Sequence, residues 1–193
     1  MLVAGACGGG TKAASTSTTA AATASSPAAS QPPAPGALTG EAQSAAAGDI
    51  PDNQVFVTYA GRAFSMKMPE GWARSGKGNQ VTFRDKNNIV RVVVVPGGGP
   101  QSVAAMRREL SGLSNARVTS PPKQLTIGGA PALKAVYTTK SSPNPVTGKS
   151  VTLTVDRYEL AKHGKRAVVD LGSPLGVDNV DAYRMMIQSF RLR

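Results

Sequence analysis

Residues 8–48 contain almost nothing that a folded core could bury, and this limits what the chain can fold into. The segment reads GGGTKAASTSTTAAATASSPAASQPPAPGALTGEAQSAAAG, which is mostly Ala, Ser, Thr, Pro and Gly. Burial of so few apolar side chains cannot offset the conformational entropy lost on ordering, so we expect a disordered linker. One domain remains, at residues 49–193, and its length suits a single hydrophobic core.

The chain's single cysteine, Cys7, lies directly before this linker and directly after MLVAGA. Small residues ahead of a cysteine, with a flexible polar segment behind it, resemble the lipobox of bacterial lipoproteins, in which the thiol carries diacylglycerol. Residues 1–7 are therefore interpreted as the end of a lipoprotein signal. A signal needs about 7–15 apolar residues, so we expect it to extend upstream of Met1. The alternative is an incidental cysteine in a disordered leader.

The rest of the chain reads as a series of short strands. Phe64, Met66 and Met68 share one face of a strand predicted at 63–69. IVRVVVVP at 89–96 is apolar enough for a central strand that is covered on both faces. Further strands are predicted at 54–59, 80–85, 123–127, 132–139, 150–160 and 166–172.

Two segments show the helical spacing of apolar residues. The first spans 102–113 with Ser102 as its N-cap, and the second precedes the C-terminus after a cap at Asp178 or Asn179. Hairpins join most of the strands, so the sheet should be mostly antiparallel. With one helix on each face, the fold class is α+β, an α-β-α sandwich.

Four short segments occur together in this domain. They are Phe64–Trp72, with the pattern Phe-x-x-x-x-Pro-x-Gly-Trp, Val81–Asp85, Gly128–Tyr137 and Ile187–Leu192. In this combination they resemble the PsbP-like superfamily, which includes the DcrB and LpqN groups of bacterial envelope lipoproteins. The resemblance covers most of residues 54–193 and implies an antiparallel sheet sandwiched by helices. It implies an accessory or binding role with diverse partners and no single activity.

Catalytic equipment is sparse in the predicted domain. It holds one histidine, His163, no cysteine, and ten scattered acidic residues. Asp156 and Glu159 are three residues apart on a predicted strand and so point to opposite faces. GGGPQS at 97–102 lacks the Gly-Lys-Ser/Thr ending of a phosphate-binding loop, and no nucleophile elbow is present. The sequence thus predicts a protein that is not an enzyme, with no catalytic residue, metal or cofactor; a hydrolase is the less favoured alternative.

The domain carries the whole net charge of the chain. The sequence has 22 Lys and Arg residues against 11 Asp and Glu residues, and residues 1–48 hold one of each, Lys12 and Glu41. The remaining 21 bases and 10 acids give the same net charge of +11. A basic domain favours anionic partners such as an acidic protein, acidic lipid, wall polymer or nucleic acid. A solvated basic surface without a partner is the alternative.

These features together predict a lipid-anchored, extracytoplasmic module of the cell membrane. We expect a monomer that is tethered through Cys7, which would carry palmitate or a similar acyl chain, and that binds an unidentified envelope protein or anionic polymer. An extracytoplasmic address argues against nucleic acid. Trp72 is expected to pack against the end of the sheet, with stacking on a ligand as the alternative. Arg107 and Arg108 are candidate partner contacts.

Overall fold

The computed structural model describes residues 48–143 and 148–193. The predicted signal, the lipidated Cys7 and residues 8–47 of the predicted linker lie outside these ranges. No helix in the described ranges is long and apolar enough to cross a membrane. In chain order the elements are β1 (Phe56–Ala60), β2 (Phe64–Pro69), β3 (Ala73–Lys77), β4 (Gln80–Asp85), β5 (Asn88–Pro96), α2 (Val103–Ser111), β6 (Arg117–Ile127), β7 (Ala130–Lys140), β8 (Thr152–Lys162), β9 (Lys165–Pro174), α3 (Val180–Ser189) and β10 (Arg191–Leu192).

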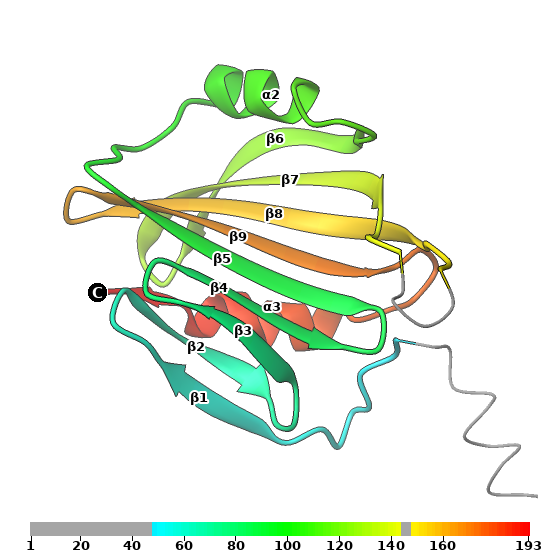
Figure 1. The fold of residues 1–193 in the computed structure, drawn as a ribbon. Helices are drawn as coiled ribbons and strands as arrows, with labels where there is room; N and C mark the ends of the chain where they lie inside the picture. The colour runs from blue at the N-terminus through cyan, green and yellow to red at the C-terminus, as the bar shows by residue number, and fades with distance from the viewer. Residues whose placement is uncertain (1–47, 144–147) are drawn as a thin grey trace, which may run out of the picture. The chain divides into compact units, whose positions relative to one another are not determined.

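Seven strands form one antiparallel sheet in the order β3-β4-β5-β9-β8-β7-β6, which confirms the mostly antiparallel α+β class (Figure 1). Val90, Val92 and Val94 of β5 are buried on one face of this sheet. The alternate residues of β5 are mostly only partly buried. The sequence led us to expect cover on both faces of this strand, and the second face is covered only in part. The reason is that α2 packs on the half of the sheet that β6, β7 and β8 form.

The strands β1, β2 and β10 form a second sheet, whereas the sequence led us to expect only one. β2 has two neighbours, because the chain returns after α3 and pairs Arg191 with Ser65. Phe64, Met66 and Met68 are buried as predicted, and they share the larger core with α3 and one face of the large sheet. Each face of the large sheet is thus covered by a helix, and on one face the small sheet adds to the cover.

The helix α2 begins where the sequence predicts. The Ser102 hydroxyl accepts a hydrogen bond from the Ala105 backbone N–H at 3.1 Å, which satisfies one of the free donors at the helix start. Met106 and Leu110 are buried in a smaller second core. Their partners there are Leu133, Ala135, Tyr137, Leu153 and Val155. The hydrophobic stripe of α2 therefore fixes the helix over β7 and β8.

The described chain begins at Gly48, packed against the start of α3. The Gly48 carbonyl accepts hydrogen bonds from Asn88 Nδ2 at 2.6 Å and from Asn179 Nδ2 at 3.0 Å. Asn179 Oδ1 also accepts from the Ile50 backbone N–H at 2.9 Å. Asn179 is the N-cap of α3 by position, but its side chain holds this N-terminal segment and does not cap the helix. A Cβ at Gly48 would lie 2.8 Å from Pro174 at a φ of +113°, so glycine is required.

Two strands were not predicted, and each has a physical reason. β3 reads ARSGK and all five residues are exposed, so it shows no alternation of apolar and polar side chains. β10 has only two residues. The strand β6 begins earlier than predicted, because it continues through Pro121 and Pro122 with shifts in register. It is an edge strand, where missing backbone N–H groups are tolerated.

Candidate functional site

A network of charged side chains lies between α2 and the large sheet, centred on the buried Arg157 of β8. The Arg157 side chain is 2% exposed. Its Nε and Nη2 donate to the two Asp170 oxygens at 2.7 and 3.1 Å, and its Nη1 donates to Glu109 Oε1 at 3.0 Å. Arg91 Nη2 donates to the same Asp170 carboxylate at 2.7 Å. Burial would lower the pKa of Arg157, but the hydrogen bonds and charge of Asp170 outweigh burial and raise this pKa.

Glu159 lies two residues further along the same face of β8, and its side chain is 2% exposed. Arg166 Nη1 donates to Glu159 Oε2 at 3.3 Å and to Glu109 Oε2 at 3.4 Å. Glu159 Oε1 has no hydrogen-bond partner among the described residues. Burial, followed by the neighbouring Glu109 carboxylate, raises the pKa of Glu159. One half of this buried carboxylate is thus held by a shared arginine, and the other half has no donor among the described residues.

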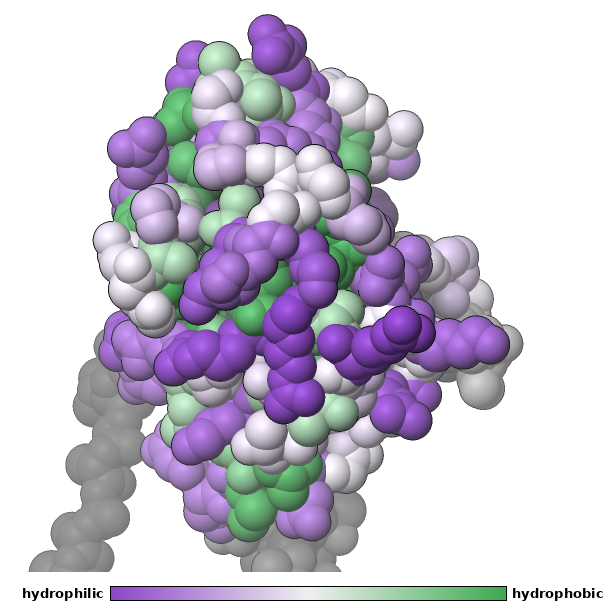
Figure 2. Space-filling view, turned by 90° about the vertical axis from the view of Figure 1, so that its left-hand side faces the viewer, coloured by the Kyte–Doolittle hydropathy of each residue, from purple (hydrophilic) through white to green (hydrophobic). Residues whose placement is uncertain are grey.

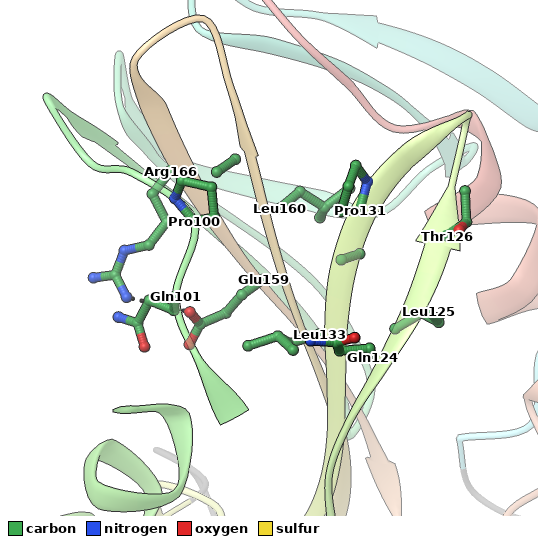
Figure 3. A pocket seen from close by; sticks show the side chains of 12 residues that line it. Pro100, Gln101, Gln124, Leu125, Thr126, Pro131, Leu133, Glu159, Leu160 and Arg166 are labelled. Carbon is green, nitrogen blue, oxygen red and sulfur yellow. Dashed lines mark hydrogen bonds and ion pairs between the residues drawn. The ribbon is translucent and has the colours of Figure 1, made fainter. Parts of the chain in front are cut away.

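A pocket of about 390 Å³ lies beside Glu159, within the size range of small-molecule sites. Figure 3 shows Pro100, Gln101, Glu159 and Arg166 grouped on one side of it. Gln101, in the segment before α2, donates from Nε2 to Glu109 Oε2 at 3.4 Å, whereas its Oε1 has no partner in the described ranges. The remaining walls come from β6, β7 and β8, with Gln124, Leu125, Thr126, Pro131, Ala132, Leu133, Leu160 and Ala161.

The pocket has both apolar and polar walls. Its described lining combines apolar side chains with two amides, a hydroxyl, a carboxylate and a guanidinium, and it contains no histidine, cysteine or lysine. Within residues 48–143 and 148–193, no group of three or more His, Cys, Asp or Glu residues is arranged to hold a metal ion. His163 is exposed at the tip of the β8–β9 hairpin, as expected of a turn residue.

A second feature is a cluster of bases at one end of the strands, which we call the basic end: Arg62, Lys162, Lys165, Arg191 and Arg193. Lys162 and Lys165 pair across the β8–β9 hairpin, and Lys165 Nζ donates to the Arg193 carbonyl. Arg193 reaches back to the residue before Arg62, and Arg191 lines a small surface pocket with Lys162. In the described part of the chain, none of the five forms an ion pair with an acid. Figure 2 shows hydrophilic side chains gathered across this end.

The candidate residues from the sequence lie apart from both features. Trp72 is partly buried and packs against the larger core, on the α3 side of the sheet. Arg107 and Arg108 are exposed on α2, on the opposite side of the sheet. Cys7 lies outside the described residues. The structure therefore does not bring Trp72 and the two arginines together into one site.

The charge network and the pocket were not predicted from the sequence. Asp156 and Glu159 do point to opposite faces, since Asp156 pairs with Lys134 at 2.6 Å on the other side of the sheet. One sequence feature does indicate the charge network: charged residues lie inside otherwise apolar strands, in VDRYEL and AVVDLG. A charge at such a position needs a partner, and Arg157 and Asp170 are partners across β8 and β9.

Comparisons with known proteins show similarity of fold. No protein-family model matches the chain, and no curated protein does. Cyanobacterial PsbP (CyanoP) from Synechocystis sp. PCC 6803 matches with a TM-score of 0.50 and 12% identity, over 76% of this chain and 98% of that chain. The large sheet, its two helices and this match show a PsbP-like fold, which confirms the fold that the sequence resemblance implied.

Two further structures are similar at lower scores. LpqN of Mycobacterium tuberculosis, described as involved in cell envelope biogenesis, matches with a TM-score of 0.39 and 15% identity, over 72% of this chain and 90% of that chain. A structure from Bacteroides thetaiotaomicron matches with a TM-score of 0.45 and 17% identity, over 72% of this chain. The match spans about half of that Bacteroides chain, 48% of its length.

Proposed function

We propose that the chain is a non-catalytic binding module of the bacterial cell envelope, tethered through a lipidated Cys7, and that its basic end binds an acidic envelope protein. The observation that carries the proposal is the basic end itself. Five bases from three separate segments gather there, and none of them forms an ion pair with an Asp or Glu side chain in the described part of the chain. The proposed location in the envelope is inferred from the sequence around Cys7. Small residues, the cysteine and the linker occur there in the same order as in lipoproteins.

The position of the basic end favours a partner other than the anchoring bilayer. The described chain enters the domain at Gly48, which is hydrogen-bonded to Asn88 at the start of β5. The other end of β5, Pro96, pairs with Lys165 of the basic end. Eight residue steps at roughly 3.3 Å each separate these ends by about 26 Å. The basic end therefore lies across the domain from the point where the tether enters.

The expected interaction is electrostatic and sensitive to salt. The five bases are mostly exposed, so each contact with an acidic partner is worth only about 0.2–1 kcal/mol and is screened over a Debye length of roughly 8 Å at physiological salt. Several such contacts together steer the encounter and set the orientation of the partner. Anionic lipid or wall polymer is the alternative occupant, because the same bases would attract any dense negative charge.

The proposal is tested with paired charge variants of the tethered protein in its host. Lys162→Gln/Arg191→Gln removes two bases of the basic end, and Arg107→Gln/Arg108→Gln removes two from α2 as a matched control. In-cell crosslinking followed by pull-down at low and high salt should recover an acidic protein with the control but little of it with the basic-end variant. Equal recovery with both variants would refute the assignment. Recovery of only lipid or wall polymer would replace the protein partner with a polyanion.

A further inference from the structure

We propose that the pocket beside Glu159 binds an uncharged small molecule in which a primary carboxamide is attached to a short apolar body. Glu159, Gln101 and Arg166 would hold the carboxamide, and the apolar walls would hold the body. None of the five bases of the basic end lines this pocket, so the proposal does not rest on an acidic protein binding at that end.

Two unpaired acceptors in the pocket wall define the head group. Glu159 Oε1 and Gln101 Oε1 are both shielded from solvent, and neither accepts a hydrogen bond from a described residue. Arg166 holds the other Glu159 oxygen, and Glu109 accepts from the Gln101 amide nitrogen, so the unpaired atom of each side chain is defined. Buried acceptors without donors are unfavourable, and a group in the pocket that both residues line can supply the donors (Figure 3). One amide nitrogen with two N–H groups can serve both oxygens.

The charges around the pocket favour a neutral ligand. The network contains equal numbers of bases and acids: Arg91, Arg157 and Arg166 against Glu109, Glu159 and Asp170. A ligand ammonium would lie close to the Arg166 guanidinium, and a ligand carboxylate would face the Glu159 carboxylate. Both hydrogen bonds from Arg166 to described side chains come from Nη1, so its other N–H groups can donate to a ligand carbonyl. A carboxamide offers two donors and one acceptor without a net charge.

The rest of the pocket suits an apolar body. Pro131, Leu133 and Ala161 contribute to the walls beyond the polar group. Covering them removes apolar surface from water, which contributes to affinity. A volume of about 390 Å³ accommodates a carboxamide with a chain of a few carbons.

Three probes of equal chain length test this ligand class on the full chain: hexanamide, hexylamine and hexanoate. Binding is followed by two-dimensional NMR, using the backbone amides of Gln101, Leu133 and Ala161 and the side-chain amide of Gln101. Hexanamide should bind with millimolar affinity, which is typical of so small a molecule. The affinity of each charged probe should be lower by about tenfold or by a larger factor. If a charged probe binds as tightly as hexanamide, or if no probe binds, the proposal is wrong.

Variants locate the bound probe. Glu159→Gln keeps the shape of the side chain but removes the carboxylate, and it should weaken hexanamide binding about tenfold. Asp156→Asn is the matched control, because it removes the same charge from the opposite face of the same strand, and affinity should stay unchanged. Ala161→Ile fills the pocket without altering the charge network and should abolish binding. If Glu159→Gln fails to fold, Ala161→Ile decides, and unchanged affinity in that variant overturns the proposal.

Discussion

Arg157→Met is the change that best tests how the charge network stabilises the domain. Methionine keeps an apolar stem of similar length but removes the three hydrogen bonds to Asp170 and Glu109. Breaking a buried ion pair by removing one partner costs roughly 3–5 kcal/mol. Asp170 keeps Arg91 at 2.7 Å and Glu109 keeps Arg166 at 3.4 Å, so neither acid is left alone. We therefore expect the free energy of unfolding to fall by about 3 kcal/mol, which is the lower end of this range.

The assay is urea denaturation of the variant beside a matched control. The control is Arg184→Met, which removes an exposed ion pair with Asp181. The Arg184 side chain is 60% exposed and the Asp181 side chain is 90% exposed. Such a surface pair contributes little, so the free energy of unfolding should change by less than about 0.5 kcal/mol. The midpoint should shift to lower urea in Arg157→Met with the m-value unchanged, since the denatured state is the same. A loss for Arg157→Met no larger than that of the control would refute the assigned role of the network.

Three further outcomes follow from individual residues. Trp72→Ala should lower the free energy of unfolding by about 2 kcal/mol, below the range for fully buried rings, because Trp72 is only partly buried against the core; unchanged stability would favour ligand stacking. The raised pKa of Glu159 makes the folded state bind this proton more tightly than the unfolded chain, so stability should fall as pH rises above the ordinary value of 4.5. Glu159→Gln should flatten that part of a pH series of urea titrations, and an unaltered slope would reject the assignment. Expressed with its native upstream sequence in a bacterium, the protein should incorporate a fatty-acid analogue; a Cys7→Ala variant that still labels would disprove the anchor.

The sequence predicts best the elements whose side chains alternate or repeat strongly. Phe64, Met66 and Met68 mark β2, and the Ser102 cap marks the start of α2, because each has a local cause that tertiary contacts only reinforce. β3 escaped prediction because it is an exposed edge strand in which apolar and polar side chains do not alternate. The three-stranded sheet escaped as well, because β2 pairs on one side with β10, which lies across most of the chain length.

The pocket and the basic end could not be predicted for the same reason. Glu109 lies far from Glu159 and Arg166 in the sequence, and only the docking of α2 on the β8–β9 hairpin brings the three together. The hairpin bases Lys162 and Lys165 were visible as a dense basic stretch, but their contact with the C-terminal segment was not. Charge composition predicts an anionic partner, and only the fold indicates where that partner would bind.

Site-specific photocrosslinking from the two ends of the large sheet tests the central proposal most directly. His163 at the tip of the β8–β9 hairpin and Lys86 at the tip of the β4–β5 hairpin are both exposed, and their φ values of 51° and 50° match. A photoreactive residue placed at each position in the tethered protein therefore perturbs the backbone equally. The proposal predicts an adduct with an acidic envelope protein from position 163 that declines as salt rises, and only background from position 86. Equal adducts from both positions, or an adduct from 163 that salt does not reduce, would contradict binding through the basic end.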